Sequence, residues 1–202
     1  MDNNNNLYHI LALGDSYTIG EGVLLAETYP YQTVQLLRRQ GYAFTAPEII
    51  ARTGWTTDEL DSAIAGARLL PSYDFVTLLI GVNNQYRGRS IEEYATQFQV
   101  LLQLAIHLTV GRPEHVFVLS IPDWGVSPFA AGRDRSAIAG QIDQFNTTAR
   151  QITTAHQAAF IDITPHSRSE GQSFTADGLH PAATQYSFWA RQLTDRITQR
   201  LP

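Results

Sequence analysis

The first predicted strand ends within the stretch Leu11-Ala12-Leu13-Gly14-Asp15-Ser16-Tyr17-Thr18-Ile19-Gly20-Glu21-Gly22. The apolar run from Tyr8 to Leu13 has the length and composition of a buried strand, and glycine and hydroxyl residues end it at once. Ser16 therefore follows the carboxyl end of a strand. Because ligands of open α/β sheets bind outside the carboxyl ends of the strands, Ser16 is a candidate for chemistry.

The composition is that of one globular domain. The 202 residues include no Pro/Gly/Ser-rich linker that would divide them, so we expect a single domain over 1–202, with residues 1–6 disordered. Fourteen basic and nineteen acidic residues give a net charge of −5. This balance argues against nucleic acid or an anionic membrane surface as a partner, because both require clustered Lys and Arg.

The sequence also limits the chemistry and the location of the protein. It has no cysteine, which excludes disulfides, thiolate catalysis and cysteine-based metal sites. No apolar run approaches the roughly 20 residues that span a bilayer, and no basic segment followed by an apolar one opens the sequence. We expect a cytoplasmic protein without a transmembrane segment.

Strand-like and helix-like patterns alternate along the chain. Capping signals at Thr28, Thr56, Ser90 and Asp134 predict helices, and a further helix is predicted near the carboxyl terminus. Parallel strands need helical crossovers, so this alternation predicts a parallel sheet covered on both faces. The expected fold is a flavodoxin-like three-layer α/β/α sandwich with five parallel strands in the order 2-1-3-4-5. The predicted strands are 8–13, 48–52, 74–80, 115–121 and 159–163.

Chemically active residues follow four of these strands, and the topology brings them to one rim. Ser16 follows the first strand, Gly54 the second and Asn83 the third, and Asp177 and His180 follow the fifth. Histidine can accept the proton of an attacking serine, and a carboxylate three residues earlier can orient its ring. The amides of Ser16 and Gly54 and the side chain of Asn83 could together stabilise an oxyanion.

Four sequence blocks carry a resemblance to a known family. Gly14-Asp15-Ser16-Tyr17, then Gly54, then Gly81-Val82-Asn83-Asn84, then Asp177-Gly178-Leu179-His180-Pro181 resemble the GDSL/SGNH hydrolases in order, spacing and context. Each block alone is a weak signal, but together they are specific and cover essentially the whole chain. The chain departs from the family pattern at Tyr17, where the family name has leucine, and at Asn84, where the usual residue is aspartate.

The resemblance implies a metal-independent esterase or lipase-like enzyme that acts through an acyl-enzyme and needs no cofactor. It implies Ser16 as nucleophile, His180 as base and Asp177 as the partner of His180, with Ser16, Gly54 and Asn83 as the oxyanion hole. The expected partner is a small-molecule ester, which could be a carboxylic ester, a thioester or an acetylated carbohydrate. Aromatic residues on the predicted rim are candidates for substrate contacts: Trp55, Tyr86, Trp124, Phe129 and Phe174.

Other interpretations of the same residues remain open at this point. Ser16 could cap a helix, Asp177 could cap the last helix, Gly54 could serve only a turn, and the aromatic residues could only pack the loops. The Gly14 to Gly22 segment could cradle the phosphate of a flavin in a non-catalytic binding module, which would make the protein yellow. A pseudo-enzyme used as an interaction domain is a third possibility. The sequence does not specify the oligomeric state.

Overall fold

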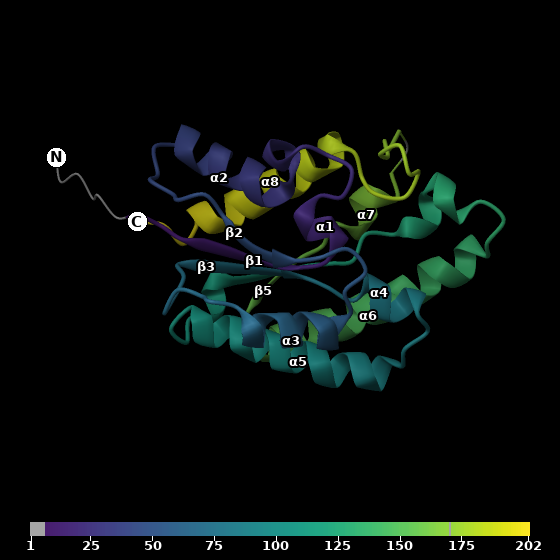
Figure 1. The fold of residues 1–202 in the computed structure, drawn as a ribbon, viewed down its shortest axis with the longest axis horizontal. Helices are drawn as coiled ribbons and strands as arrows, with labels where there is room; N and C mark the ends of the chain where they lie inside the picture. Colours follow the sequence, from purple (N-terminus) through teal and green to yellow (C-terminus); the bar gives the residue numbers. More distant parts are fainter. Residues whose placement is uncertain (1–6, 170) are drawn as a thin grey trace.

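The computed structural model describes residues 7–169 and 171–202, so the expected disorder of residues 1–6 lies outside the described residues. The protein has three layers, with the sheet between two groups of helices (Figure 1). Helices α2 and α8 pack against each other on one face, and α3, α5 and α6 cover the other. No helix of the described residues is both long and apolar enough to span a membrane.

The sheet confirms the predicted topology. All of its pairings are parallel and the strand order is β2-β1-β3-β4-β5. The central strands β1 and β3 are buried along their whole length, as strands covered on both faces should be. The strands are β1 (Ile10–Gly14), β2 (Glu48–Ala51), β3 (Phe75–Leu79), β4 (Val116–Leu119) and β5 (Ala159–Ile161).

The long helices begin where the capping signals predict. Thr56 and Glu59 form a capping box before α3, and the side chain of Ser90 accepts a hydrogen bond from the Glu93 amide at the start of α5. The carboxylate of Asp134 caps α6 in the same way. These helices are α2 (Tyr29–Arg39), α3 (Thr57–Gly66), α5 (Ile91–Leu108), α6 (Arg135–Ala155) and α8 (Ala183–Thr198).

Short helices occur where loops were predicted. Each contains only four or five residues, too few for an apolar period to be visible in the sequence. They are α1 (Ser16–Ile19), α4 (Val82–Tyr86) and α7 (Thr164–Ser167), and single 3-10 turns occupy Leu25–Glu27, Pro113–His115, Trp124–Val126 and Pro128–Ala130. Helices α1 and α4 follow the carboxyl ends of β1 and β3, so each presents its first residues at the edge of the sheet where the candidate site lies.

Candidate active site

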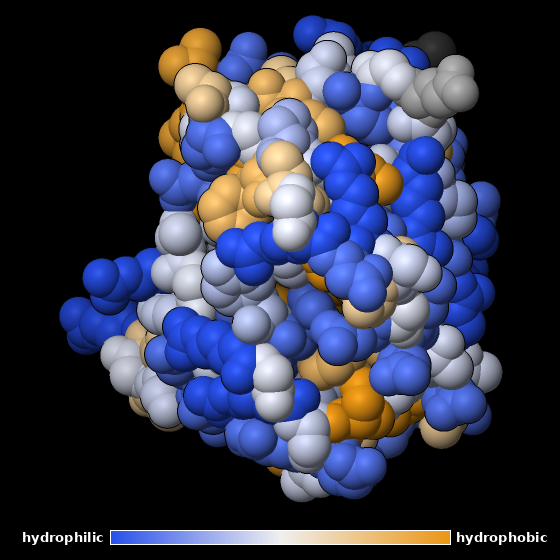
Figure 2. Space-filling model, turned by 90° about the vertical axis from the view of Figure 1, so that its right-hand side faces the viewer, coloured by the Kyte–Doolittle hydropathy of each residue, from blue (hydrophilic) through white to orange (hydrophobic). Residues whose placement is uncertain are grey.

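A pocket of about 180 Å³ opens at the carboxyl ends of the strands, on the side of the molecule that faces the viewer in Figure 2. Hydrophobic and hydrophilic side chains are mixed on this face. The lining comes from segments after β1, β2, β3 and β4 and from the loop before α8. The pocket is lined by Ser16, Tyr17, Thr53, Gly54, Val82, Asn83, Tyr86, Trp124, Phe129, Leu179 and His180.

Ser16 is held by a tight turn between β1 and α1. It is the first residue of α1, and the carboxylate of Asp15 caps this helix by accepting a hydrogen bond from the Tyr17 amide at 3.0 Å. A side chain at Gly14 would lie 2.2 Å from Thr18 Oγ1 and 2.3 Å from the Leu79 carbonyl oxygen. Only glycine therefore allows the chain to turn here directly from the strand into the helix.

His180 is oriented by Asp177. The two side chains are 2.6 Å apart, from Nδ1 of the ring to Oδ2 of the carboxylate. The other carboxylate oxygen accepts hydrogen bonds from the amides of Leu179 and His180 and from the Thr175 hydroxyl, at 2.7 to 3.0 Å. Because Asp177 is bound on both oxygens, it fixes the ring of His180 and leaves Nε2 free for the pocket.

These contacts also set the charge of Asp177. Burial raises the pKa of its carboxyl, but the hydrogen bonds from His180, Leu179 and Thr175 outweigh burial and hold the pKa well below its usual range. Asp177 is therefore a carboxylate at neutral pH. It does not cap the last helix, because α8 begins at Ala183, with Ala182 as its N-cap.

Ser16 and His180 line the same pocket without a hydrogen bond between Oγ and the ring in the described structure. Catalytic hydrogen bonds are often longer without substrate than in the reacting complex, so this arrangement is compatible with proton transfer from serine to histidine. The ring of Tyr17 meets the ring of His180 edge-on, with 5.9 Å between centroids, and limits its movement.

Hydrogen-bond donors surround the space in front of Ser16. The amides of Ser16 and Gly54 have no acceptor among the described residues. Gly54 has a φ of +86°, a left-handed conformation that favours glycine, so its identity is also explained by the turn. The side-chain amide of Asn83 donates to the Trp55 carbonyl at 2.9 Å and has a second N–H.

Two further residues, Asn84 of α4 and Arg87 just after it, bind the segment that leads from β2 into the first residue of α3. Asn84 is completely buried, accepts from the Thr57 amide at 3.1 Å and donates to the Thr57 hydroxyl at 2.7 Å. Arg87 donates to the Gly54 carbonyl at 2.6 Å. The asparagine that departs from the family pattern therefore makes an anchoring contact, and it holds Asn83 beside Gly54.

Asp15 lies behind the pocket in a different environment from Asp177. Burial is complete and raises the pKa of its carboxyl to about 7, and the hydrogen bond from the Tyr17 amide opposes this only in part. Its Oδ2 atom has no hydrogen-bond partner among the described residues. Asp15 therefore keeps its proton to a much higher pH than an exposed aspartate does.

The predicted aromatic residues divide into two groups. Tyr86, Trp124 and Phe129 line the pocket, and the Trp124 ring is held by a 2.8 Å hydrogen bond from Nε1 to Gln85. The other two are outside the lining: Trp55 packs against the hydrophobic core, and Phe174 pairs with Pro181 in an isolated β-bridge.

Sequence analysis did not predict four of the pocket residues: Tyr17, Thr53, Val82 and Leu179. Each is a neighbour of a motif residue, and this adjacency was the only signal available. Within the described residues, no group of three or more histidine, aspartate or glutamate side chains is arranged to hold a metal ion.

Comparison with known proteins gives one family and many similar structures. The model of the GDSL-like Lipase/Acylhydrolase family matches residues 12–188. A search of curated protein sequences gave no match. Among solved structures, the acetylxylan esterase Axe2 from Geobacillus stearothermophilus has a TM-score of 0.75 at 18% identity, covering 94% of each chain.

Two further structures have the same fold over nearly the whole chain. The lipase/acylhydrolase from Enterococcus faecalis has a TM-score of 0.73 at 20% identity, covering 96% of this chain and 97% of that chain. TesA has a TM-score of 0.72 at 17% identity, covering 97% of this chain and 100% of that chain. At such low identities, these likenesses establish the fold.

Proposed function

Since the chain belongs to the GDSL-like lipase/acylhydrolase family, we propose that it hydrolyses carboxylic esters of small groups through an acyl-enzyme on Ser16. The observation that carries this proposal is the 2.6 Å contact between Asp177 and His180. The histidine held by this contact lines the same pocket as Ser16. A serine hydroxyl needs such an oriented base to become a nucleophile.

The first half of the reaction forms the acyl-enzyme. Nε2 of His180 takes the Ser16 proton as Oγ attacks the ester carbonyl carbon, and the carboxylate of Asp177 stabilises the imidazolium that results. The imidazolium then gives this proton to the departing alkoxide, so that the alcohol leaves neutral. Water attacks the acyl-enzyme in the same way, with His180 as base, and releases the acid and free Ser16.

The negative charge of the tetrahedral intermediates falls on the former carbonyl oxygen. The amides of Ser16 and Gly54 and the second N–H of Asn83 are the donors that we assign to it. Loss of one such donor costs about a hundredfold to a thousandfold in turnover. The bonds of Asn84 and Arg87 to the neighbouring loop support this role, because they fix two of the three donors relative to each other.

The size of the pocket limits the group that it can enclose. A cavity of about 150 Å³ holds one benzene molecule, whereas sites for drug-sized ligands measure about 300 to 1,000 Å³. At about 180 Å³, the pocket fits a short acyl chain or one aromatic ring. The same volume argues against the flavin-binding alternative, because a flavin mononucleotide is itself of drug size.

Replacing the nucleophile tests the proposal directly. We expect Ser16→Ala to fold normally and to lose about 10⁴-fold or more in kcat on p-nitrophenyl esters, because no other group replaces the attacking oxygen. Circular dichroism checks the fold. Turnover by the purified variant within tenfold of the unmodified protein would exclude Ser16 from the mechanism.

Two further measurements separate the remaining alternatives. A fluorophosphonate should label Ser16 in the unmodified protein and not in Ser16→Ala, whereas a pseudo-enzyme would remain unlabelled. Across p-nitrophenyl acetate to decanoate, we expect kcat/KM to be highest for acyl chains of about six carbons or fewer, from the volume argument above. A steady rise up to decanoate would contradict the assignment of small substrates.

A further inference from the structure

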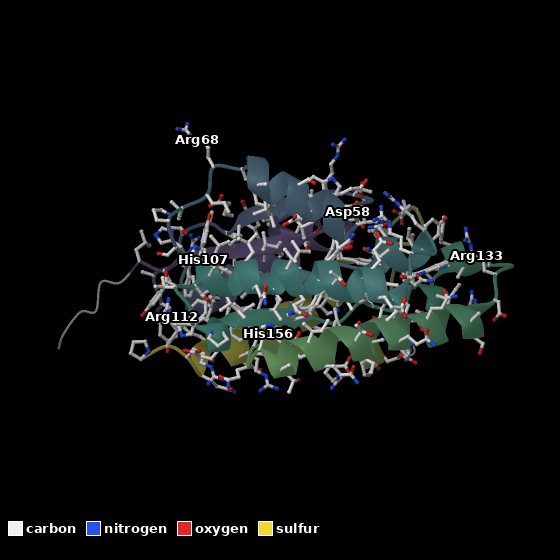
Figure 3. All side chains as sticks on the ribbon, turned by 90° about the horizontal axis from the view of Figure 1, so that it is seen from below. Asp58, Arg68, His107, Arg112, Arg133 and His156 are labelled. Carbon is white, nitrogen blue, oxygen red and sulfur yellow. The ribbon has the colours of Figure 1, made fainter. Side chains whose placement is uncertain are left out.

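Arg133 lies on the aromatic wall of the pocket. The carbon of its guanidinium group is 5.4 Å from the ring centroid of Tyr86, 5.4 Å from that of Trp124 and 5.0 Å from that of Phe129. All three rings line the pocket. Figure 3 places Arg133 just before the start of α6, at the end of the molecule opposite Arg112. One guanidinium group therefore covers three rings that come from two segments, α4 and the loop between β4 and α6.

The ring contacts hold the cation but leave most of its hydrogen bonds unused. Within the part of the chain that the structure describes, no ion pair includes Arg133, and the one hydrogen bond of its side chain is a long contact of 3.4 Å to the Tyr86 hydroxyl. Asp134, the nearest carboxylate in sequence, uses an oxygen to cap α6 instead. A guanidinium group has five N–H donors, so Arg133 can bind another acceptor.

Four arginines of the described structure form ion pairs: Arg87, Arg89, Arg150 and Arg168. Arg168 binds the carboxylates of Asp123 and Asp143, and Arg89 binds those of Asp58 and Glu93. Arg133 has no carboxylate partner among the described residues, which is also true of Arg135, but unlike Arg135 it stacks on rings that line the pocket. The described pocket lining also contains no acidic residue that would neutralise it.

We propose that Arg133 is a specificity-determining residue that binds an anionic group of the ester substrate, such as a carboxylate or a phosphate. The planar guanidinium matches these groups with two parallel hydrogen bonds, and its stacking on Tyr86, Trp124 and Phe129 fixes its orientation beforehand. Arg133 is exposed, as are Tyr86 and Phe129, so its free N–H donors are open to an incoming anion. This inference rests on the proposed ester hydrolysis.

The experiment compares charged and neutral esters of equal size. One pair carries the charge on the acyl side: monomethyl adipate against methyl hexanoate. The other carries it on the alcohol side: 4-acetoxybenzoate against p-tolyl acetate. Hydrolysis is followed by proton release for the unmodified protein, Arg133→Met, Arg133→Lys and Arg135→Met. Arg135→Met is the matched control, because it removes the same charge two residues away, where the side chain only contacts the Ser127 carbonyl.

We expect kcat/KM for the charged ester to exceed that for its neutral partner in at least one pair. Arg133→Met should reduce this ratio by about 10- to 100-fold, mainly through KM, and Arg135→Met should keep it, because the interaction is a local charge-assisted pair. Arg133→Lys should retain part of the ratio, because it keeps the charge and loses the planar fork. The pair that responds shows on which side of the ester the anionic group lies.

Two results would overturn the inference. A charged-to-neutral ratio that is unchanged by Arg133→Met in both pairs would leave ester hydrolysis intact and remove Arg133 from recognition. If Arg135→Met loses the preference for the charged ester to the same extent, the preference comes from the overall electrostatic field of the protein and not from a contact with Arg133. If no ester is turned over more by the unmodified protein than by Ser16→Ala, the proposed function itself fails, and the inference fails with it.

Discussion

Replacing Asp15 by asparagine should change how the stability of this protein depends on pH. Asp15 is completely buried, its carboxyl has a pKa raised to about 7 from an ordinary value of 3.8, and its Oδ2 atom has no partner among the described residues. Between these two values the folded protein keeps a proton that the unfolded chain has lost. The free energy of unfolding therefore falls as pH rises from about 4 to above 7.

The size of the effect follows from the two pKa values. Each unit of difference corresponds to 1.36 kcal/mol, so the full penalty is about 4 kcal/mol, of which about 3 kcal/mol develops between pH 5 and pH 8. Asparagine has nearly the shape of the protonated carboxyl and does not titrate. The free energy of unfolding of Asp15→Asn, minus that of the unmodified protein, should therefore increase by about 3 kcal/mol from pH 5 to pH 8.

Urea unfolding followed by tryptophan fluorescence measures this difference. Any constant cost of the new amide, such as an unpaired N–H group, is the same at both pH values and does not enter the comparison. Asp61→Asn, which removes an exposed carboxylate from α3, controls for the change in net charge. If the free-energy difference between Asp15→Asn and the unmodified protein stays within about 0.5 kcal/mol from pH 5 to pH 8, the reasoning about this buried carboxyl is refuted.

Two other substitutions test the site and its support. Asp177→Asn should lower kcat about 10⁴-fold, because an amide group opposite Nδ1 favours the tautomer of His180 that cannot take the Ser16 proton. Steady-state assays measure this effect, with Asp162→Asn as the control. A kcat within tenfold of that of the unmodified protein would contradict the prediction. Asn84→Ala should lower the free energy of unfolding by about 1 to 3 kcal/mol, because the buried Thr57 amide loses its acceptor. Urea unfolding measures the effect of Asn84→Ala, with the surface variant Gln144→Ala as the control. A decrease in the free energy of unfolding of less than about 0.5 kcal/mol would contradict the prediction.

The sequence predicted the sheet well because its signals are local. The apolar run of β3 and the capping residues Thr56, Ser90 and Asp134 lie within a few positions of the elements they define. The strand order 2-1-3-4-5 followed from the alternation of strands and helices, and it is confirmed. The short helices α1, α4 and α7 were missed, because four or five residues give no periodicity.

The candidate site was predicted less completely, because it depends on contacts between distant residues. The anchoring role of Asn84 is visible only with Thr57, 27 positions earlier, and the place of Arg133 only with Tyr86, 47 positions earlier. The aromatic residues on the rim were chosen by type, and type alone did not separate Tyr86, which lines the pocket, from Trp55, which faces the core. Spacing in the sequence carries no information on such side-chain directions.

The bonds between α4 and the loop after β2 make two strand ends behave as one rigid part. Residues 54–57 are bound at three positions by hydrogen bonds of 2.6 to 3.1 Å: Gly54 by Arg87, Trp55 by Asn83 and Thr57 by Asn84. An insertion or loop exchange on either side would shift both, whereas residues 124–133 make no side-chain hydrogen bond to residues 54–57 and meet α4 through the Trp124–Gln85 bond and the ring of Tyr86. Redesign of substrate preference should therefore begin at residues 125–133, where a change leaves the joint between α4 and the loop after β2 in place.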